Sequence, residues 1–229
     1  MRAVEVARVA IFHGWKNVKL VGLFADFTDG KDGSTHISME DVGIMRSIPM
    51  SKVFSPSGPI ILGKMLKAII EYEGPVYLRI ENEAYPDFYD EDFIFEIGKS
   101  YVLRDGSDVS ILAYGSATSR AMEAAEKLEK KGISAEIIDV PTIKPFDSET
   151  LIKSVLKTGK LITVEDHNIY GGLASAASET ISQNSISVKF KVLGIKDVFN
   201  ESGEPKRLRE KYGVSTDHIY CAAMEICGR

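Results

Sequence analysis

Short apolar runs alternate with amphipathic stretches along most of this 229-residue chain. Runs rich in branched residues and bounded by Gly, Pro or polar residues predict buried strands, and apolar positions three or four residues apart predict helices. An amphipathic helix ended by Gly14 opens the pattern. The segments that follow are predicted in turn as strand, helix, strand, helix and strand: residues 17–24, about 38–48, 51–54, 60–72 and 76–80.

The second part of the chain continues the alternation at greater length. Asp147 is placed to cap the start of one helix and Gly159 to end it. The predicted strands are residues 109–114, 135–139, 161–165 and 188–193, and the predicted helices are residues 118–131, 147–158, 173–181, 205–212 and 218–226. Because helices between strands usually cross over between parallel strands, the sequence predicts an α/β protein.

An acidic, aromatic stretch without a clear period, residues 81–95, separates the two parts. We interpret it as a linker and expect two units, residues 1–90 and 91–229. The first unit opens on a helix and has only three predicted strands, although a doubly wound sheet normally opens on a strand. We therefore expect a partial domain whose apolar edge near residues 17–24 is unpaired, so that the chain self-associates or needs a partner.

Composition narrows the classes of function. A hydrophobic share of 44% supports a packed core, and a net charge of −5 with a pI near 5.5 argues against nucleic acid or an anionic membrane as the main partner. Cys221 and Cys227 suit neither a disulfide framework nor a zinc site, which indicates a reducing, cytoplasmic setting. No apolar run approaches the roughly 18–20 residues of a membrane span, and no signal peptide is evident.

The most distinctive polar stretch is DFTDGKDGSTHISMEDVGIMR, residues 26–46. Its Asp-Gly pairs predict turns, and Ser38 followed three residues later by Asp41 predicts a capped helix start. His36 lies just before that start, and Asp32 lies in the loop ahead of it. Spacing alone leaves two interpretations open: a solvated, capped turn, or a loop that delivers Asp32 and His36 for polar chemistry.

Two other polar groups end predicted strands, where ligands bind in open α/β sheets. Gly115-Ser116 at a helix start could bind a phosphate through backbone N–H groups, although a plain strand-to-helix turn is the simpler interpretation. Glu165-Asp166-His167 could form an acid/base cluster, although such a histidine more often serves as a capping or interface group.

Several longer motifs occur together in one order: KDGSTHISMEDVGIMRSIP, GPVYLRI, FEIGKSYVLRDGSDVSILAYGS, ISAEIIDVPTIKPFD, TVEDHNIYGGLASAASE and NESGEPKRLREKYGVS. In this order and spacing they resemble the C-terminal section of transketolases, most closely the split, two-subunit type. The resemblance covers nearly the whole chain. The β subunit of 2-oxo-acid dehydrogenase E1 components and deoxyxylulose-phosphate synthase share the architecture, but DGSTH and DVPTIKPFD resemble transketolases more closely.

The resemblance implies a partial, parallel-sheet pyrimidine-binding domain followed by a complete α/β domain of the transketolase C-terminal type. It also implies a thiamine-diphosphate-dependent transferase that moves a two-carbon ketol unit between sugars. In such families the thiamine diphosphate and its magnesium ion are held mainly by an N-terminal section, which we expect to be a partner chain here. The C-terminal domain is expected to support homodimerisation, and the substrate to be a sugar or sugar phosphate.

The same resemblance assigns roles to four positions of this sequence. Asp32 matches an aspartate that binds a donor hydroxyl, and His36 matches a histidine near the reacting carbons, which makes it the expected catalytic residue. Phe24 stands at the position of a phosphate-binding histidine, and Asn82 at that of a phosphate-binding arginine. Because Asn82 is flanked by Glu81 and Glu83, we expect its surroundings to repel a phosphate.

The family's glutamate that protonates the aminopyrimidine ring lies upstream of the motifs found in this chain. We therefore expect another polypeptide, or upstream coding sequence, to supply it. Three hypotheses remain: a catalytic section that is active only with partner chains, a non-catalytic assembly subunit or truncated remnant, and an enzyme for an unphosphorylated or differently charged ketose.

Overall fold

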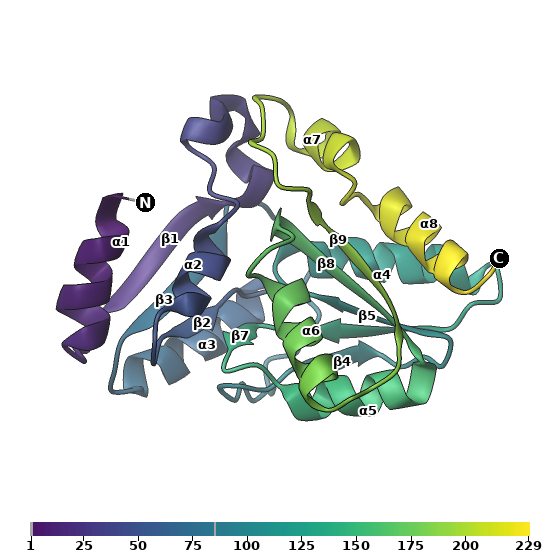
Figure 1. The fold of residues 1–229 in the computed structure, drawn as a ribbon, viewed down its shortest axis with the longest axis horizontal. Helices are drawn as coiled ribbons and strands as arrows, with labels where there is room; N and C mark the ends of the chain where they lie inside the picture. Colours follow the sequence, from purple (N-terminus) through teal and green to yellow (C-terminus); the bar gives the residue numbers. More distant parts are fainter. Residues whose placement is uncertain (1, 85) are drawn as a thin grey trace.

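Two β-sheets organise the chain in the computed structural model, which describes residues 2–84 and 86–229 (Figure 1). The first sheet has the order β1 (Lys19–Ala25), β3 (Val76–Glu81), β2 (Lys52–Phe54) and β7 (Thr142–Lys144). The second has the order β4 (Tyr101–Arg104), β6 (Ala135–Asp139), β5 (Val109–Ala113), β8 (Lys160–Asn168) and β9 (Lys189–Ile195). Among these described strands only β7 and β4 run antiparallel to their neighbours, so the expected α/β fold with largely parallel sheets is confirmed.

Helices lie around both sheets. The first sheet is accompanied by α1 (Arg2–Val6), the π-helical segment η1 (Ala7–His13), α2 (Asp41–Ser47) and α3 (Pro59–Glu71). The second is accompanied by α4 (Ser116–Glu129), α5 (Ser148–Thr158), α6 (Leu173–Gln183), α7 (Pro205–Tyr212) and α8 (Thr216–Ile226). As predicted, the Asp147 side chain accepts a hydrogen bond from Thr150 N at the start of α5, and Gly159 ends that helix in the left-handed region.

Of the three described strands with fewer than five residues, β2 was predicted, but β4 and β7 were not. Strand β4 adds a fifth strand to the second sheet, where four were expected. Strand β7 follows β6 in the chain but pairs with β2 of the first sheet, and Lys144 Nζ donates to the carbonyls of Arg46 and Ile48 at 2.7 and 2.6 Å. Strand β7 thereby links the two sheets. Runs of three or four residues are too short to show a period. Strand β2 was recognised from the prolines on both sides of it, a signal that β4 lacks and that was overlooked at β7.

The predicted cap of the second helix is wrong. Helix α2 begins at Asp41 after Glu40, and the Ser38 hydroxyl instead lies 3.5 Å from Glu40 Oε2. Met39 is buried and its carbonyl accepts a hydrogen bond of 2.7 Å from Asn168 N at the end of β8. This contact between distant segments holds residues 38–40 outside the helix, so no capping box forms.

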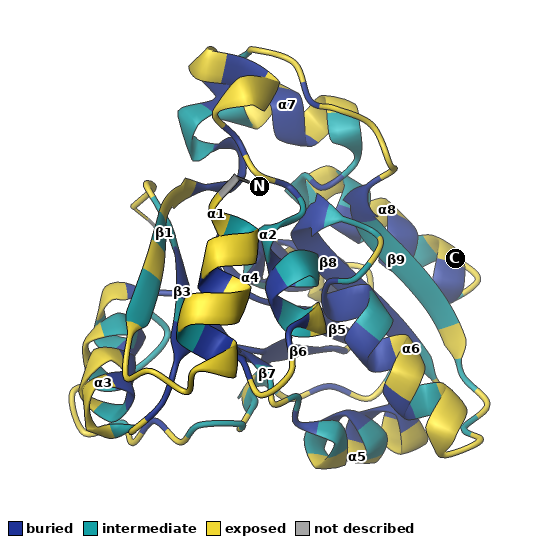
Figure 2. Ribbon diagram, turned by 60° about the vertical axis from the view of Figure 1, so that its left-hand side comes forward, coloured by how far each residue is buried: buried dark blue, intermediate teal, exposed yellow. Residues whose placement is uncertain are grey.

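Strand β1 lies at the edge of the first sheet with apolar side chains in solvent. Val21, Leu23 and Phe24 are 49%, 60% and 47% exposed, and Figure 2 shows the contrast between this strand and the buried β3 beside it. Among the described residues, no strand pairs with the outer edge of β1. The unpaired apolar edge expected from the sequence is therefore present. No helix in the described part of the chain is both long and apolar enough to cross a membrane.

Candidate functional site

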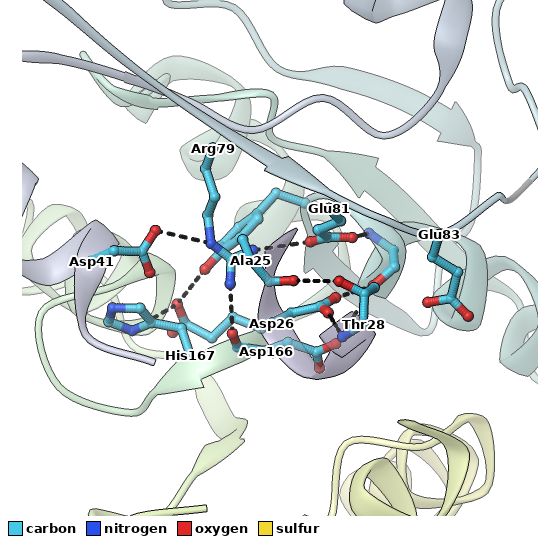
Figure 3. A network of polar contacts seen from close by, with 12 residues as sticks. Ala25, Asp26, Thr28, Asp41, Arg79, Glu81, Glu83, Asp166 and His167 are labelled. Carbon is cyan, nitrogen blue, oxygen red and sulfur yellow. Dashed lines mark hydrogen bonds and ion pairs between the residues drawn. The ribbon is translucent and has the colours of Figure 1, made fainter. Parts of the chain in front are cut away.

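Buried charged side chains gather where the carboxyl ends of β1, β3 and β8 meet (Figure 3). Arg79 on β3 is fully buried and is at the centre of the group. Its guanidinium donates to Asp41 Oδ2 at 3.1 Å, to Glu81 Oε1 at 2.9 Å and to the Asp166 carbonyl at 2.9 Å. Tyr77 also donates to Asp41 Oδ2, at 2.8 Å. Because a buried cation is stable only when paired, these contacts fix the end of β3 against β8 and α2.

A second group of charges continues from the first toward α7. Asp26, the residue after β1, is fully buried, and its Oδ2 accepts from Ser116 Oγ at 3.0 Å and from Arg209 Nη2 at 3.4 Å. Asp166 receives Arg120 Nη2 at 2.6 Å and Arg209 Nε at 3.3 Å. Arg209 thus pairs with carboxylates from both halves of the chain, whereas Arg120 pairs with Asp166 of its own half.

The carboxyls of this cluster differ in acidity because their neighbours differ. Burial, followed by the nearby carboxylates of Glu81 and Asp166, raises the pKa of Asp26 well above its usual range. For Asp166 the effect of burial is outweighed by Arg120 and Arg209, which hold its pKa below the usual value. The pKa values of Asp26 and Asp166 are therefore shifted in opposite directions although both carboxyls are fully buried.

Asp32 and His36 are placed by the segment after β1. Residues 26–35 form a 3-10 helical segment, η2 (Asp26–Thr35), that is kinked at Asp29 and Gly33, where a plain loop was expected. Both Asp32 and His36 are exposed, and His36 Nδ1 lies 3.0 Å from the Thr35 hydroxyl. The segment therefore presents both predicted side chains to solvent rather than to the core.

Phe24 and Asn82 lie on the two neighbouring strand ends. Phe24 is in β1 and adopts a positive φ of 57°, while Asn82 directly follows β3, and both are exposed. The Thr28 hydroxyl accepts a hydrogen bond of 3.2 Å from Asn82 N and donates to the Ala25 carbonyl at 2.8 Å. The structure therefore brings the segment that carries Asp32 and His36 beside the loop that carries Asn82.

The repulsion of a phosphate expected at Asn82 requires that the negative charges of Glu81 and Glu83 have no cationic partner. The structure shows a partner for each. Glu81 is fixed by Arg79, and Glu83 accepts from Arg209 Nη1 at 3.0 Å. Both flanking carboxylates therefore have a cationic partner. The two arginines, one of them 126 residues from Glu83 in the chain, could not be assigned from the local sequence. The repulsion of a phosphate itself stays a prediction.

Glu165, Asp166 and His167 lie within β8, where His167 Nδ1 is 3.8 Å from Glu165 Oε2, but the hydrogen bonds of Glu165 and His167 go mainly to other parts of the protein. Glu165 accepts hydrogen bonds from Leu173 N and Ala174 N at the start of α6, at 2.7 and 2.9 Å. His167 is fully buried: Nε2 accepts from Gly43 N at 3.1 Å, and Nδ1 lies 2.6 Å from the carbonyl of the next residue. Both side chains are thus used for capping and packing, the simpler of the two interpretations.

The Gly115-Ser116 turn is likewise occupied by the protein itself. Gly115 has a φ of 57°, and a Cβ there would lie 2.2 Å from Glu81 Oε1, so glycine is required for the close approach. Ser116 N donates to Glu81 Oε2 at 2.7 Å. A carboxylate from β3 therefore takes the position in which a phosphate would bind. In the part of the chain that is described, no group of three or more His, Cys, Asp or Glu is placed to hold a metal ion.

A solvent-accessible cavity of about 480 Å³ adjoins this cluster between the loop after β3 and helices α4, α7 and α8. Glu83, Ser116, Arg120 and Arg209 line its inner wall. The loop after β3 therefore borders a cavity that solvent can enter.

Comparison with known proteins assigns this arrangement to a family. Over residues 98–219 the sequence matches the family described as transketolase, C-terminal domain, and over residues 4–87 it matches the family described as transketolase, pyrimidine binding domain. The chain belongs to the transketolase family. The resemblance to transketolases that was drawn from the motifs is thereby confirmed.

Individual members of the transketolase family match along almost the whole chain. A 6-deoxy-6-sulfo-D-fructose transketolase subunit of Clostridium sp. (strain MSTE9) is 38% identical over 228 residues, covering 100% of this chain and 70% of that protein. One of the apulose-4-phosphate transketolase subunits of Phocaeicola vulgatus is 34% identical over 225 residues, covering 98% and 72%. A solved chain described as split gene transketolase, inactive beta4 tetramer, superimposes with a TM-score of 0.91 at 36% identity, covering 99% of this chain and 72% of that chain. These matches confirm the similarity to split transketolases.

The charged cluster beneath the predicted site residues could not be predicted from the sequence. Arg79, Arg120 and Arg209 occur in stretches that look like ordinary strand or amphipathic helix. Their partners in other segments lie far away along the chain. Asp41 is 38 residues from Arg79, and Asp26 is 183 residues from Arg209. The available signal was an arginine inside the apolar run VYLRI, since a charge in a buried strand requires a partner.

Proposed function

We propose that the chain is the C-terminal section of a thiamine-diphosphate-dependent, transketolase-like enzyme that transfers a two-carbon ketol unit between sugars. The observation that carries this proposal is the pairing of two loops at the carboxyl ends of β1 and β3, joined by the hydrogen bond from Asn82 N to Thr28 Oγ1. Ligands of parallel α/β sheets bind at this edge. Membership of the transketolase family supports the class of reaction.

In this proposal the exposed side chains of η2 and the residue after it act on the sugar. The carboxylate of Asp32 accepts a hydrogen bond from a donor hydroxyl and thereby orients it. His36 uses Nε2 toward the substrate, since Nδ1 lies beside the Thr35 hydroxyl, and exchanges a proton with a hydroxyl near the reacting carbons. Phe24 and Asn82 flank the same sugar.

The cofactor and metal belong, in this proposal, mainly to an N-terminal section on a partner chain. The open edge of β1 supports the need for a further polypeptide. We further propose that the C-terminal domain, residues 91–229, forms a homodimer, and that the enzyme works in the cytoplasm.

The substrate class is proposed as a sugar or sugar phosphate. The names of two relatives concern a 6-deoxy-6-sulfo sugar and a sugar 4-phosphate, and each of these sugars carries a strongly acidic group. Because Glu81 and Glu83 are both paired with arginines, the charge around Asn82 is compatible with such a substrate.

A second candidate, a non-catalytic assembly subunit, is favoured by one observation. The solved relative is described as an inactive beta4 tetramer. If this chain has only an assembly role, its exposed polar residues are dispensable for turnover of the complex.

The test of the first proposal is substitution of His36 by Asn in the chain combined with a transketolase N-terminal section. We expect kcat/KM for ketol transfer to fall by about 100-fold or more, because general acid–base groups contribute factors of that size. His13→Asn is the control, since His13 is also exposed but lies at the end of η1, before β1 begins. If His36→Asn turns over as fast as the control, the proposed role of the loop is wrong.

A further inference from the structure

Arg209 connects the two loops that carry the proposed substrate residues. It lies on α7 and is only 7% exposed, which is unusual for an arginine near the end of an eight-residue helix. Its Nη2 donates to Asp26, the first residue of η2, and its Nη1 and Nη2 both donate to Glu83, the residue after Asn82. One guanidinium therefore holds both segments.

The remaining contacts close a ring around this guanidinium. Asp26 Oδ1 accepts from Thr28 N at 2.5 Å, and the Thr28 hydroxyl accepts from Asn82 N at 3.2 Å. Asn82 precedes Glu83, whose carboxylate returns to Arg209. Each loop is thus tied to the other directly, through Thr28, and indirectly, through Arg209.

The chain ahead of α7 also packs directly on η2 (Figure 1). Gly203 N donates to the Gly30 carbonyl at 2.9 Å, and a Cβ at Gly30 would lie 2.5 Å from the Gly203 carbonyl oxygen. The rings of Phe27 and Tyr212 stack at 5.5 Å with an interplanar angle of 8°. The C-terminal family domain therefore forms the support on which η2 lies.

Arginine suits this position because three carboxylates converge on it. Asp26, Glu83 and Asp166 come from three segments, and a planar fork with five N–H donors can reach all of them, whereas an ammonium group cannot. Without this cation, the buried carboxyls of Asp26 and Asp166 would face each other with less compensation. Of the contacts described above between the two loops, only the hydrogen bond between Asn82 N and Thr28 Oγ1 would then remain.

We propose that Arg209 is a positioning residue that fixes η2 and the loop after β3 relative to each other, acting from the C-terminal domain on side chains that it does not itself touch. That these loops face a substrate rests on the proposed function. That Arg209 holds them together rests on the contacts alone.

The test compares Arg209→Met, Arg209→Lys and the control Arg207→Met, which removes an exposed arginine from the same helix. Amide hydrogen exchange is measured on the full chain. We expect Arg209→Met to speed exchange in residues 26–36 and 81–84 by about 100-fold, because removing one partner of a buried ion pair strongly destabilises the others. Arg209→Lys keeps the charge but not the fork, and should speed exchange by roughly tenfold.

Two exchange results would overturn the proposal. One is that residues 26–36 exchange at the same rate in Arg209→Met as in Arg207→Met. The other is acceleration that spreads evenly through β5, β6 and β8, which would indicate a general loss of stability. If Arg209→Met does not fold, the same comparison between Arg209→Lys and Arg207→Met decides the question.

A kinetic readout separates this inference from the proposed function. In the chain combined with an N-terminal section, Arg209→Lys should raise KM for the donor sugar more than it lowers kcat, because the loops bind substrate but Arg209 does not touch it. If exchange in the loops is faster and the donor KM is unchanged, the positioning role of Arg209 holds, and the assignment of these loops to substrate is wrong.

Discussion

Asp139 is a fully buried carboxyl at the end of β6, where the second sheet meets the linker. Its oxygens accept hydrogen bonds from the hydroxyls of Tyr89 and Thr118, at 2.6 and 3.0 Å, and from Ser57. Burial nevertheless raises its pKa to about 6, because three hydroxyls do not fully replace water around a charge. The contact between the two units therefore contains a group that titrates in the mildly acidic range.

This acidity predicts a specific pH dependence of stability. Because the folded-state pKa of Asp139 lies above its ordinary value of 3.8, the folded chain binds more protons than the unfolded chain between about pH 4 and pH 6. The contribution of Asp139 to the free energy of unfolding therefore falls as pH rises through this window, by on the order of 3 kcal/mol. Chemical denaturation at several pH values measures the effect. Between pH 4 and pH 6, the free energy of unfolding of Asp139→Asn should fall less steeply with rising pH than that of the unmodified chain, or should rise.

Asp90→Asn is the matched control, since Asp90 is an exposed carboxyl of the same linker. The control should keep the pH profile of the unmodified chain. If Asp139→Asn and Asp90→Asn give the same profile between pH 4 and pH 6, the carboxyl of Asp139 is not the titrating group.

At the scale of elements, the sequence predicted mainly the helices and strands that are long enough to show a hydrophobic pattern. The buried strands β5 and β6 were placed to within one residue. Strand β8 was found but was predicted to end at residue 165, three residues early, because its polar end does not look like a buried strand. Strands β4 and β7 have four and three residues and were missed. The candidate loop was found from its Asp-Gly turns and motif, but its buried support was not, since Arg79 and Arg209 depend on contacts between segments far apart in the chain.

The open edge of β1 leads to a prediction of its own. An edge strand with exposed apolar side chains favours association, so the chain alone should sediment as a species heavier than the 25.2 kDa monomer. Leu23→Lys should weaken this association roughly 30-fold, since burial of one leucine contributes about 2 kcal/mol and a charge opposes strand pairing. Sedimentation velocity over a concentration series measures the effect.

Leu156→Lys is the control for this experiment, because Leu156 is 69% exposed but lies on α5, away from β1. It should leave association unchanged. A well-behaved monomer of the unmodified chain, or an equal effect of both substitutions, would show that β1 is not the associating edge.

At the scale of the whole molecule, the two sheets are joined by a strand and by charge. Strand β7 connects them at one place, and the cluster around Arg79, Asp166 and Arg209 connects them at the carboxyl ends of their strands. The proposed substrate side chains are therefore held by the C-terminal half although they belong to the N-terminal half. The chain covers 70–72% of the length of the two relatives compared above, and in the proposed function a partner section completes the site.

The most direct test of this account is an assay of ketol transfer with purified components. The chain is tested alone, with a transketolase N-terminal section, and with that section plus thiamine diphosphate and magnesium. We expect no turnover by the chain alone and measurable transfer only when section, cofactor and metal are all present. Transfer by the chain alone, or no gain when the section is added, would contradict the proposal of a split active site.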